Sequence, residues 1–257
     1  MVVYLTQALG RNVLQFLERA GGTFILLAQI IFESRTAWRD RRIIIEQMHA
    51  VGVMSLPLVS VTSLFTGAVS AWQAAYQFEG MVSLTYLGGA TAIAIFMELG
   101  PVLTALVLAG RVGASIAAEL GTMKVTEQID ALECLAISPA RYLAMPRFWG
   151  VTIMLPILTV YANIIALFGA YVVAYTLLEV SGTMFFDSVQ TFFELRNVLG
   201  GLTKSVAFGA TISLVGCYVG FQTHGGAEGV GRSTIDAFVL SAILILINDY
   251  ILALLIF

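Results

Sequence analysis

Two carboxylates, Glu98 and Asp249, stand inside long apolar stretches of the chain. A charged side chain inside a bilayer is costly unless it is paired, protonated or hydrated, and such residues often serve transport. Pro101 follows Glu98 by three positions and lacks the N–H of a normal helical hydrogen bond, so a kink is expected beside this carboxylate. The pattern favours Glu98 in the wall of a polar cavity, with a structural carboxyl bonded to a neighbouring helix as the alternative. For Asp249 the two interpretations are equally supported, because adjacent Asn248 can share a polar contact between helices.

Motifs for catalysis and for nucleotide or metal binding do not occur in the sequence. A P-loop requires G-x-x-x-x-G-K-[ST], and neither of the chain's lysines, Lys124 and Lys204, follows a glycine. His49 and His224 stand apart, and neither H-E-x-x-H nor G-x-S-x-G is present. We therefore expect no catalytic residue, no metal site and no cofactor. The chain is expected not to be an enzyme and to depend on a separate subunit for any ATP hydrolysis.

The composition indicates the environment in which these residues lie. Of the 257 residues, 59% are hydrophobic and 11% are charged, whereas soluble domains have about 25% charged residues. A water-soluble surface cannot be built from so few charges, which indicates a membrane protein. The formal net charge of -3 and the lack of a basic patch argue against nucleic acid as a partner.

Long apolar stretches with few or no charges predict the membrane spans. A hydrocarbon core about 30 Å thick requires about 20 helical residues. Five stretches reach that length, at residues 50–76, 84–110, 149–177, 205–223 and 237–257. The expected fold class is therefore an all-α integral membrane protein with five transmembrane helices, forming a single domain over residues 1–257.

The N-terminal segment, residues 1–45, has a different pattern. Apolar residues recur at helical spacing and are interrupted by charges, which is typical of an amphipathic helix. Its longest strongly apolar stretch, residues 23–32, is about half as long as a span. A helix lying in the membrane interface is expected, with a buried helix of the soluble type as the alternative. The apolar positions are Leu5, Leu9, Val13, Phe16, Ala20, Phe24, Leu27 and Ile31.

The basic residues of the connections predict the orientation, because Lys and Arg are retained on the cytoplasmic side. With the N-terminus in the cytoplasm, eleven basic residues fall inside and only Arg196 and Lys204 fall outside. Five spans then place the C-terminus on the outer side. The inner residues are Arg11, Arg19, Arg35, Arg39, Arg41, Arg42, Arg111, Lys124, Arg141, Arg147 and Arg232.

The longest cytoplasmic connection, residues 111–147, contains a short helical pattern. Thr126 is expected to cap a helix whose first turn carries Glu127 and Asp130, both favourable near the positive end of a helix dipole. Ser138 and Pro139 are expected to end it. The helix would carry an apolar stripe that docks in a partner's groove or packs on the membrane surface, and the sequence supports both equally. The stripe consists of Ile129, Leu132, Leu135 and Ala136.

Four motifs in the second half of the second span and in this connection resemble the MlaE/YrbE family of permease subunits. These permeases belong to bacterial lipid-transport ABC systems that work with MCE-domain proteins. The motifs are E-L-G-P-V-L-T-A-L at 98–106, A-G-R-V-G at 109–113, A-E-L-G-T-M at 118–123 and T-E-Q-I-D-A-L at 126–132. Weaker matches extend the resemblance over nearly the whole chain, at Phe65, Gly67, Gln73, 146–149, Lys204, Ser205, Asp249 and Tyr250.

The resemblance implies a homodimer of permeases with an interfacial N-terminal helix and five spans. It further implies two ATP-binding cassette ATPase subunits, a hexamer of MCE-domain proteins in the periplasm, and a place in the bacterial inner membrane, where membrane lipid asymmetry is maintained. In such an assembly the short helix would couple the permease to the ATPase through Glu127, Gln128, Ile129, Asp130 and Leu132.

The resemblance also implies an outward-facing lipid cavity around Glu98. Met97 stands where the family often carries a basic residue, so this motif supplies no adjacent cation for Glu98. Because the second span begins close to the end of the first, residues of both should line the cavity. We expect the lining to consist of Glu98, Leu99, Phe65, Val69, Trp72, Phe78 and Met81.

Two functions are therefore considered. The first is an ATP-driven permease that moves phospholipid or a related lipid between the inner membrane and a periplasmic MCE partner, with acyl chains among apolar residues. The alternative is a secondary transporter or channel that uses Glu98 and Asp249 as ion or proton sites. A neighbouring gene for a P-loop ATPase would favour the first, and proton-coupled uptake by the purified chain alone would favour the second.

Overall fold

The computed structural model describes residues 21–36, 40–78 and 82–256, and within these ranges the chain is helical and has no strand. Five helical segments are long and apolar enough to cross a membrane. They confirm the predicted all-α membrane protein, and each is longer than its predicted span because the helices continue into the charged flanks. They are Arg41–Phe78, Leu84–Val125, Ala140–Thr176, Leu195–Phe221 and Gly226–Ile256.

The first three spans are composite. The first joins α2 (Arg41–Gly52) to α3 (Leu56–Phe78) through a 3-10 turn, Val53–Ser55. The third joins a π-helical turn, Ala140–Ala144, to α8 (Met145–Thr176). The second begins with a 3-10 turn, Leu84–Tyr86, and has π-helical turns at Ile95–Leu99 and Ala109–Gly113 between α4 (Leu87–Ala94), α5 (Gly100–Leu108) and α6 (Ala114–Val125).

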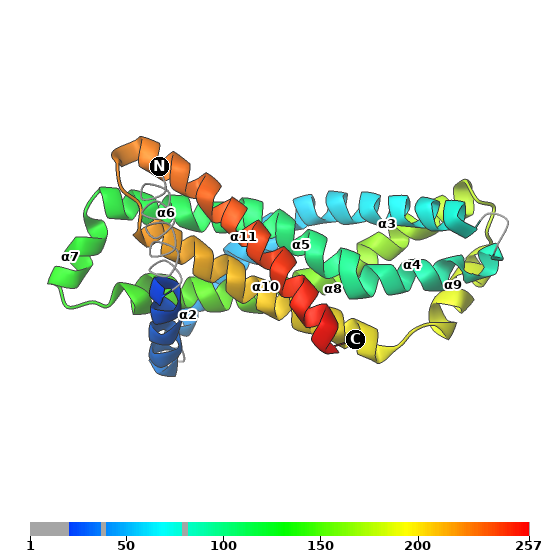
Figure 1. Ribbon diagram of the computed structural model, residues 1–257, viewed down its shortest axis with the longest axis horizontal. Helices are drawn as coiled ribbons and strands as arrows, with labels where there is room; N and C mark the ends of the chain where they lie inside the picture. The colour runs from blue at the N-terminus through cyan, green and yellow to red at the C-terminus, as the bar shows by residue number, and fades with distance from the viewer. Residues whose placement is uncertain (1–20, 37–39, 79–81, 257) are drawn as a thin grey trace, which may run out of the picture.

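The remaining elements connect or complete the bundle. The short helix α7 (Gln128–Cys134) links the second and third spans, and α9 (Gly182–Thr191) precedes the fourth. The fourth and fifth spans are the single helices α10 (Leu195–Phe221) and α11 (Gly226–Ile256). The bundle is elongated, with α7 at one end and α9 at the other (Figure 1).

The bundle is organised around α8 and α10. Helix α8 contacts α2, α3, α5 and α10, whereas α10 contacts α6, α8 and α11. The backbones of α3 and α8 approach closely: a Cβ at Gly67 would lie 1.8 Å from the carbonyl oxygen of Ala166. Small residues therefore permit this contact, as is common between helices in membranes.

The N-terminal segment contains a helix over Gly21–Glu33, preceding a 3-10 turn at Ser34–Thr36. It lies across the long axis of the bundle near the α7 end (dark blue in Figure 1). Leu26 and Ile30 are buried in the core, whereas Phe24 and Ile31 are exposed. The helix is therefore apolar on two sides: one packs on the core, and the predicted face with Phe24 and Ile31 is exposed, as expected for a helix lying in the membrane interface. The predicted helical positions from Leu5 to Ala20 lie outside the described residues.

The second span continues through Pro101 by means of a π-helical turn. Gly100 donates its N–H to the carbonyl of Ile95, one residue further back than in an α-helix. Pro101 has no N–H to donate, and the π-helical turn before it changes the backbone hydrogen-bonding pattern on its N-terminal side. π-helical turns occur frequently at functional sites, and this one contains Glu98.

Candidate functional site

Lys204 joins the two membrane carboxylates. Its Nζ lies 2.6 Å from Oε1 of Glu98 and 2.9 Å from Oδ1 of Asp249. The three side chains come from the second, fourth and fifth spans. We call this group the ion triad. The Lys204 side chain is 0% exposed, that of Asp249 is mostly buried, and that of Glu98 is 43% exposed.

The position of Lys204 corrects the sequence analysis, which placed this residue outside the membrane, just before the fourth span. The structure begins α10 at Leu195, so Lys204 lies more than two turns inside the helix. A charge was used to mark the end of an apolar stretch, although a paired charge can lie within a span. The missing cation beside Glu98 is therefore supplied by another span rather than by position 97.

Close backbone packing brings α10 against the π-helical turn. Gly201 sits so near this turn that a Cβ there would lie 2.1 Å from the carbonyl oxygen of Phe96. Lys204 follows Gly201 by three positions, about one helical turn, and therefore lies on the same face of α10. This packing places the ammonium group directly beside Glu98.

The ion triad lies toward the α9 end of the bundle. Arg196, near the start of α10, donates a hydrogen bond of 2.7 Å to the carbonyl of Ile256 at the end of α11. Lys204 and Asp249 each lie roughly 10 to 14 Å along their helices from these ends. Helix α11 ends before α3 and α4 do, so these two helices extend further toward the α9 end than the helix that carries Asp249 (Figure 1).

The predicted cavity residues are divided between two environments. Phe65, Val69 and Trp72 are exposed along one face of α3, at spacings of four and three residues. Phe78 is partly buried, and Met81 lies outside the described residues. We call the exposed Phe65, Val69 and Trp72 the α3 stripe.

Leu99 lies on a different side of α3 from this stripe. It borders a small pocket together with Thr62, Ser63 and Thr66. Glu98 instead contacts α10 and α11 through the triad. The structure of one chain thus does not gather Glu98, Leu99 and the α3 stripe around one site, and their common cavity stays a prediction that requires a second copy.

The predicted coupling helix is present, but its cap and its apolar side differ from expectation. Thr126 does not cap α7; its hydroxyl donates to the carbonyl of Thr122 over 2.8 Å, within the end of α6. Glu127 occupies the cap position with a left-handed φ of 60°. Sequence reasoning missed this because Thr and Ser also bond backward to carbonyls one turn earlier.

The predicted apolar stripe of α7 is divided: Ile129 and Leu132 face their own chain, whereas Leu135 and Ala136, just after the helix, are exposed. Ile129 is 4% exposed and belongs to the same buried cluster as Leu26 and Ile30, and Leu132 packs against that cluster. Glu127, Gln128 and Asp130 remain exposed. Because Ile129 is buried, it cannot contact a partner directly in this conformation. The polar side of α7 remains accessible to a partner. The role of these five residues in coupling to an ATPase stays a prediction.

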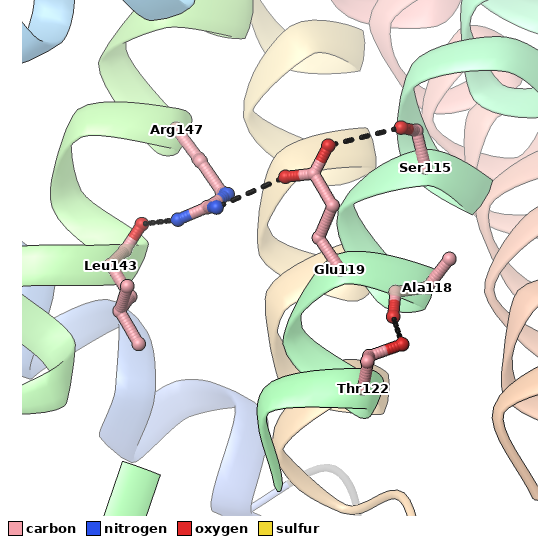
Figure 2. A network of polar contacts seen from close by, with 6 residues as sticks. All are labelled: Ser115, Ala118, Glu119, Thr122, Leu143 and Arg147. Atoms are coloured by element: carbon pink, nitrogen blue, oxygen red, sulfur yellow. Dashed lines mark hydrogen bonds and ion pairs between the residues drawn. The ribbon is translucent and has the colours of Figure 1, made fainter. Parts of the chain in front are cut away.

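A polar contact links the spans on either side of α7. Arg147 of α8 donates to Oε2 of Glu119 in α6 over 3.0 Å and to the carbonyl of Leu143 over 2.9 Å (Figure 2). Ser115 donates to the other oxygen of Glu119 over 3.3 Å. Sequence reasoning used Arg147 to predict orientation and in the family match at 146–149, but it did not predict this pair, because two residues 28 positions apart leave no local signal.

The fold and the triad define a multi-pass helical membrane protein with paired charges inside its spans. A comparison with known families gives a closer assignment, since the family Permease MlaE matches residues 44–255. The chain belongs to this family of permeases.

Similarity to individual proteins extends over nearly the full chain. A probable ABC transporter permease protein of Synechocystis is 40% identical, covering 93% of this chain and 91% of its own length. Another from Rickettsia typhi is 38% identical, covering 100% and 99%. The intermembrane phospholipid transport system permease protein MlaE of Haemophilus influenzae is 30% identical, covering 100% and 99%.

Proposed function

We propose that this chain is the permease subunit of an ATP-driven transporter that moves phospholipid between the inner membrane and a periplasmic MCE-domain partner. Its membership of the MlaE family supports the permease role. The phospholipid substrate is supported by the name of the Haemophilus influenzae relative. The ion triad is the structural observation that carries the proposal, because it puts a charged, partly exposed site inside an otherwise apolar bundle.

The triad suits contact with a lipid headgroup. Lys204 and the two carboxylates carry a formal net charge of -1 when all are ionised. Glu98 is the most exposed member and would contact the headgroup, while buried Lys204 fixes its position. Pairing with Lys204 lowers the cost of holding Glu98 and Asp249 within the membrane.

Two copies of the chain would complete the lipid cavity. The α3 stripe offers an apolar surface suited to acyl chains or to a second copy. In a homodimer, two stripes would face a shared space, with each Leu99 and Glu98 deeper in its wall. Phe78 and Met81 complete the proposed lining near the end of the first span.

Energy would come from two ATP-binding cassette subunits bound at the α7 end. The second and third spans lead directly into and out of α7, so movement of this helix would be transmitted to both. The polar side of α7, with Glu127, Gln128 and Asp130, is the surface we assign to the ATPase. This arrangement places the N-terminus in the cytoplasm and the C-terminus in the periplasm.

The alternative, a secondary transporter or channel, has less support. It requires Glu98 and Asp249 to exchange ions or protons, yet both carboxylates already contact the buried ammonium of Lys204. The relatives are named as ABC permeases. Proton-coupled lipid movement by the chain without its ATPase would reverse this preference.

Photo-crosslinking tests the proposal in membranes that contain the complete transporter. A photoreactive residue at Phe65 should capture phospholipid, and capture should change when ATP is supplied. Ile164 on α8 is a matched control, because it is 61% exposed and Phe65 is 65% exposed. Equal, ATP-independent capture at both positions would reject the α3 stripe as part of the transport path.

A further inference from the structure

A second candidate site lies at the α7 end of the bundle, apart from the ion triad. A cavity of about 760 Å³ is lined by the Gly21–Glu33 helix, by α7 and by the ends of the neighbouring spans. This volume falls within the usual range for small-molecule sites, about 300–1,000 Å³. We call it the α7 cavity. Its lining residues are Ile25, Leu26, Ala28, Gln29, Phe32, Glu33, Lys124, Ile129, Glu133, Ser138, Pro139, Ala140 and Phe221.

The α7 cavity lies where the membrane spans end. Lys124 is in the last turn of the second span, Ala140 is the first residue of the third, and Phe221 is the last residue of the fourth. The ends of apolar spans mark the boundary between hydrocarbon and headgroups. Of these three, the fourth span ends together with its apolar stretch, residues 205–223, which places the Phe221 side of the cavity at headgroup depth, whereas the second and third spans here have continued past their apolar stretches.

The Gly21–Glu33 helix contributes exposed apolar residues to the cavity lining. Ile25 and Phe32 line the cavity and are 62% and 64% exposed. Their neighbours Phe24 and Ile31 are also exposed. An apolar surface of this extent at the membrane boundary suits hydrocarbon chains rather than water.

Charged groups of both signs lie at the polar side of the cavity. Lys124 contacts Asp130 over 2.6 Å and has three donors, so it can also bind a phosphate oxygen. Arg35, which is not a lining residue, stacks over the ring of the lining residue Phe32 at 5.3 Å. Glu133 supplies a carboxylate that can accept hydrogen bonds from an amine.

We propose that the α7 cavity binds a phospholipid with an amine headgroup from the surrounding leaflet, separately from the transported lipid. Its acyl chains would lie against Ile25 and Phe32, its phosphate near Lys124, and its amine near Glu133. A phospholipid is favoured over a protein segment because it supplies hydrocarbon, a phosphate and an amine at this depth. The bound lipid would bridge the Gly21–Glu33 helix and α7, and so would set the position of α7.

Site-specific photo-crosslinking tests this site in the complete transporter, reconstituted in nanodiscs of phosphatidylethanolamine and phosphatidylglycerol in equal amounts. A photoreactive residue at Gln29 should capture phosphatidylethanolamine several-fold more than one at Ile31, an exposed neighbour outside the lining. Ala28→Trp, which fills the cavity from an exposed position, should abolish capture at Gln29. Glu133→Gln should reduce the preference for phosphatidylethanolamine without removing capture.

Several results would overturn the proposal. Equal capture at Gln29 and Ile31 would show ordinary boundary lipid, and capture of a partner subunit or of residues 1–20 would assign the cavity to protein. Equal capture of both lipids at Gln29 would reject the amine-specific site. The comparison of Gln29 with Ile31 does not depend on whether Ala28→Trp folds. A negative result in this experiment would not count against the proposed transport site, because that site is tested separately by crosslinking at Phe65.

Discussion

The guanidinium of Arg147 in α8 holds the carboxylate of Glu119 in α6 at 3.0 Å, which ties together the two spans that enclose α7 in the sequence. A second hydrogen bond to the carbonyl of Leu143 fixes the arginine on its own helix. The Arg147 side chain is mostly buried, whereas Glu119 is largely exposed. The pair therefore constrains the separation of α6 and α8 beside α7.

We predict that Arg147→Met weakens coupling more than stability. Because Glu119 can be hydrated when its partner is lost, the expected loss of stability is about 1 kcal/mol. Looser spacing of α6 and α8 should raise the ATP consumed per lipid moved in proteoliposomes. The control is Glu46→Gln, which removes the charge from the largely exposed Arg42–Glu46 pair. An unchanged ratio of ATP to lipid in Arg147→Met would show that the pair is only structural.

Lys204→Met should be the most destabilising single change in the ion triad. It leaves Glu98 and Asp249 facing each other without their shared cation, and we expect a loss of about 2–4 kcal/mol. Glu98→Gln should cost less, since the Lys204–Asp249 pair remains, and should alter lipid transport. Unfolding in detergent and transport in proteoliposomes measure the two effects. Equal stability of the two variants would contradict this account of the triad.

The number of spans was predictable, but the partners within them were not. Long apolar stretches report directly on the length needed to cross a bilayer. Lys204 was misplaced because it stands just before the uncharged stretch 205–223 and was taken as its boundary, although pairing with Glu98 allows it inside the span. Lys204 and Glu98 are 106 residues apart in the sequence, so no local spacing predicts their contact.

The sequence also does not show which surface a short apolar stripe packs against. The pattern of α7 predicts that Ile129 and Leu132 share a side, which the structure confirms by packing both on the chain's own core. Periodicity cannot tell whether the surface that receives them belongs to the same chain or to a partner. The buried cluster that receives them includes Leu26 and Ile30, about one hundred positions earlier.

The buried position of Ile129 gives a prediction for α7. Ile129→Ala should destabilise the docking of α7 by about 2 kcal/mol or more, whereas Gln128→Ala should leave it unchanged. Gln128→Ala should instead weaken ATPase binding, because its side chain lies on the exposed side. Hydrogen exchange of α7 and ATPase pull-down measure the two effects separately. Normal exchange in Ile129→Ala would contradict the packing described here.

The orientation can be tested with the chain's own cysteines. Cys134 is exposed on α7 and Cys217 is buried in α10. If α7 is cytoplasmic, a membrane-impermeant maleimide should leave Cys134 unlabelled in intact spheroplasts and label it after lysis. A cysteine tag after residue 257 should react in intact spheroplasts. Labelling of Cys134 before lysis would reverse the predicted topology.

Val69→Trp should block lipid transport by volume while preserving assembly. Val69 is exposed on the α3 stripe, so a larger ring can be accommodated in the isolated chain without displacing buried atoms. In the proposed dimer the same ring would project into the shared lipid cavity. Leu99→Trp is a weaker test of blocked lipid passage, because Leu99 is partly buried beside Ser63 and Thr66 and a larger ring would disturb that packing.

Ile164→Trp is the matched control for Val69→Trp, because Ile164 is also an exposed apolar residue, on α8. We expect transport in proteoliposomes to fall at least tenfold for Val69→Trp and to stay near normal for Ile164→Trp, with equal dimer and ATPase content. Transport near normal in both variants would exclude Val69 from the lipid path. A loss of dimer in Val69→Trp alone would instead assign the α3 stripe to the contact between the two permeases.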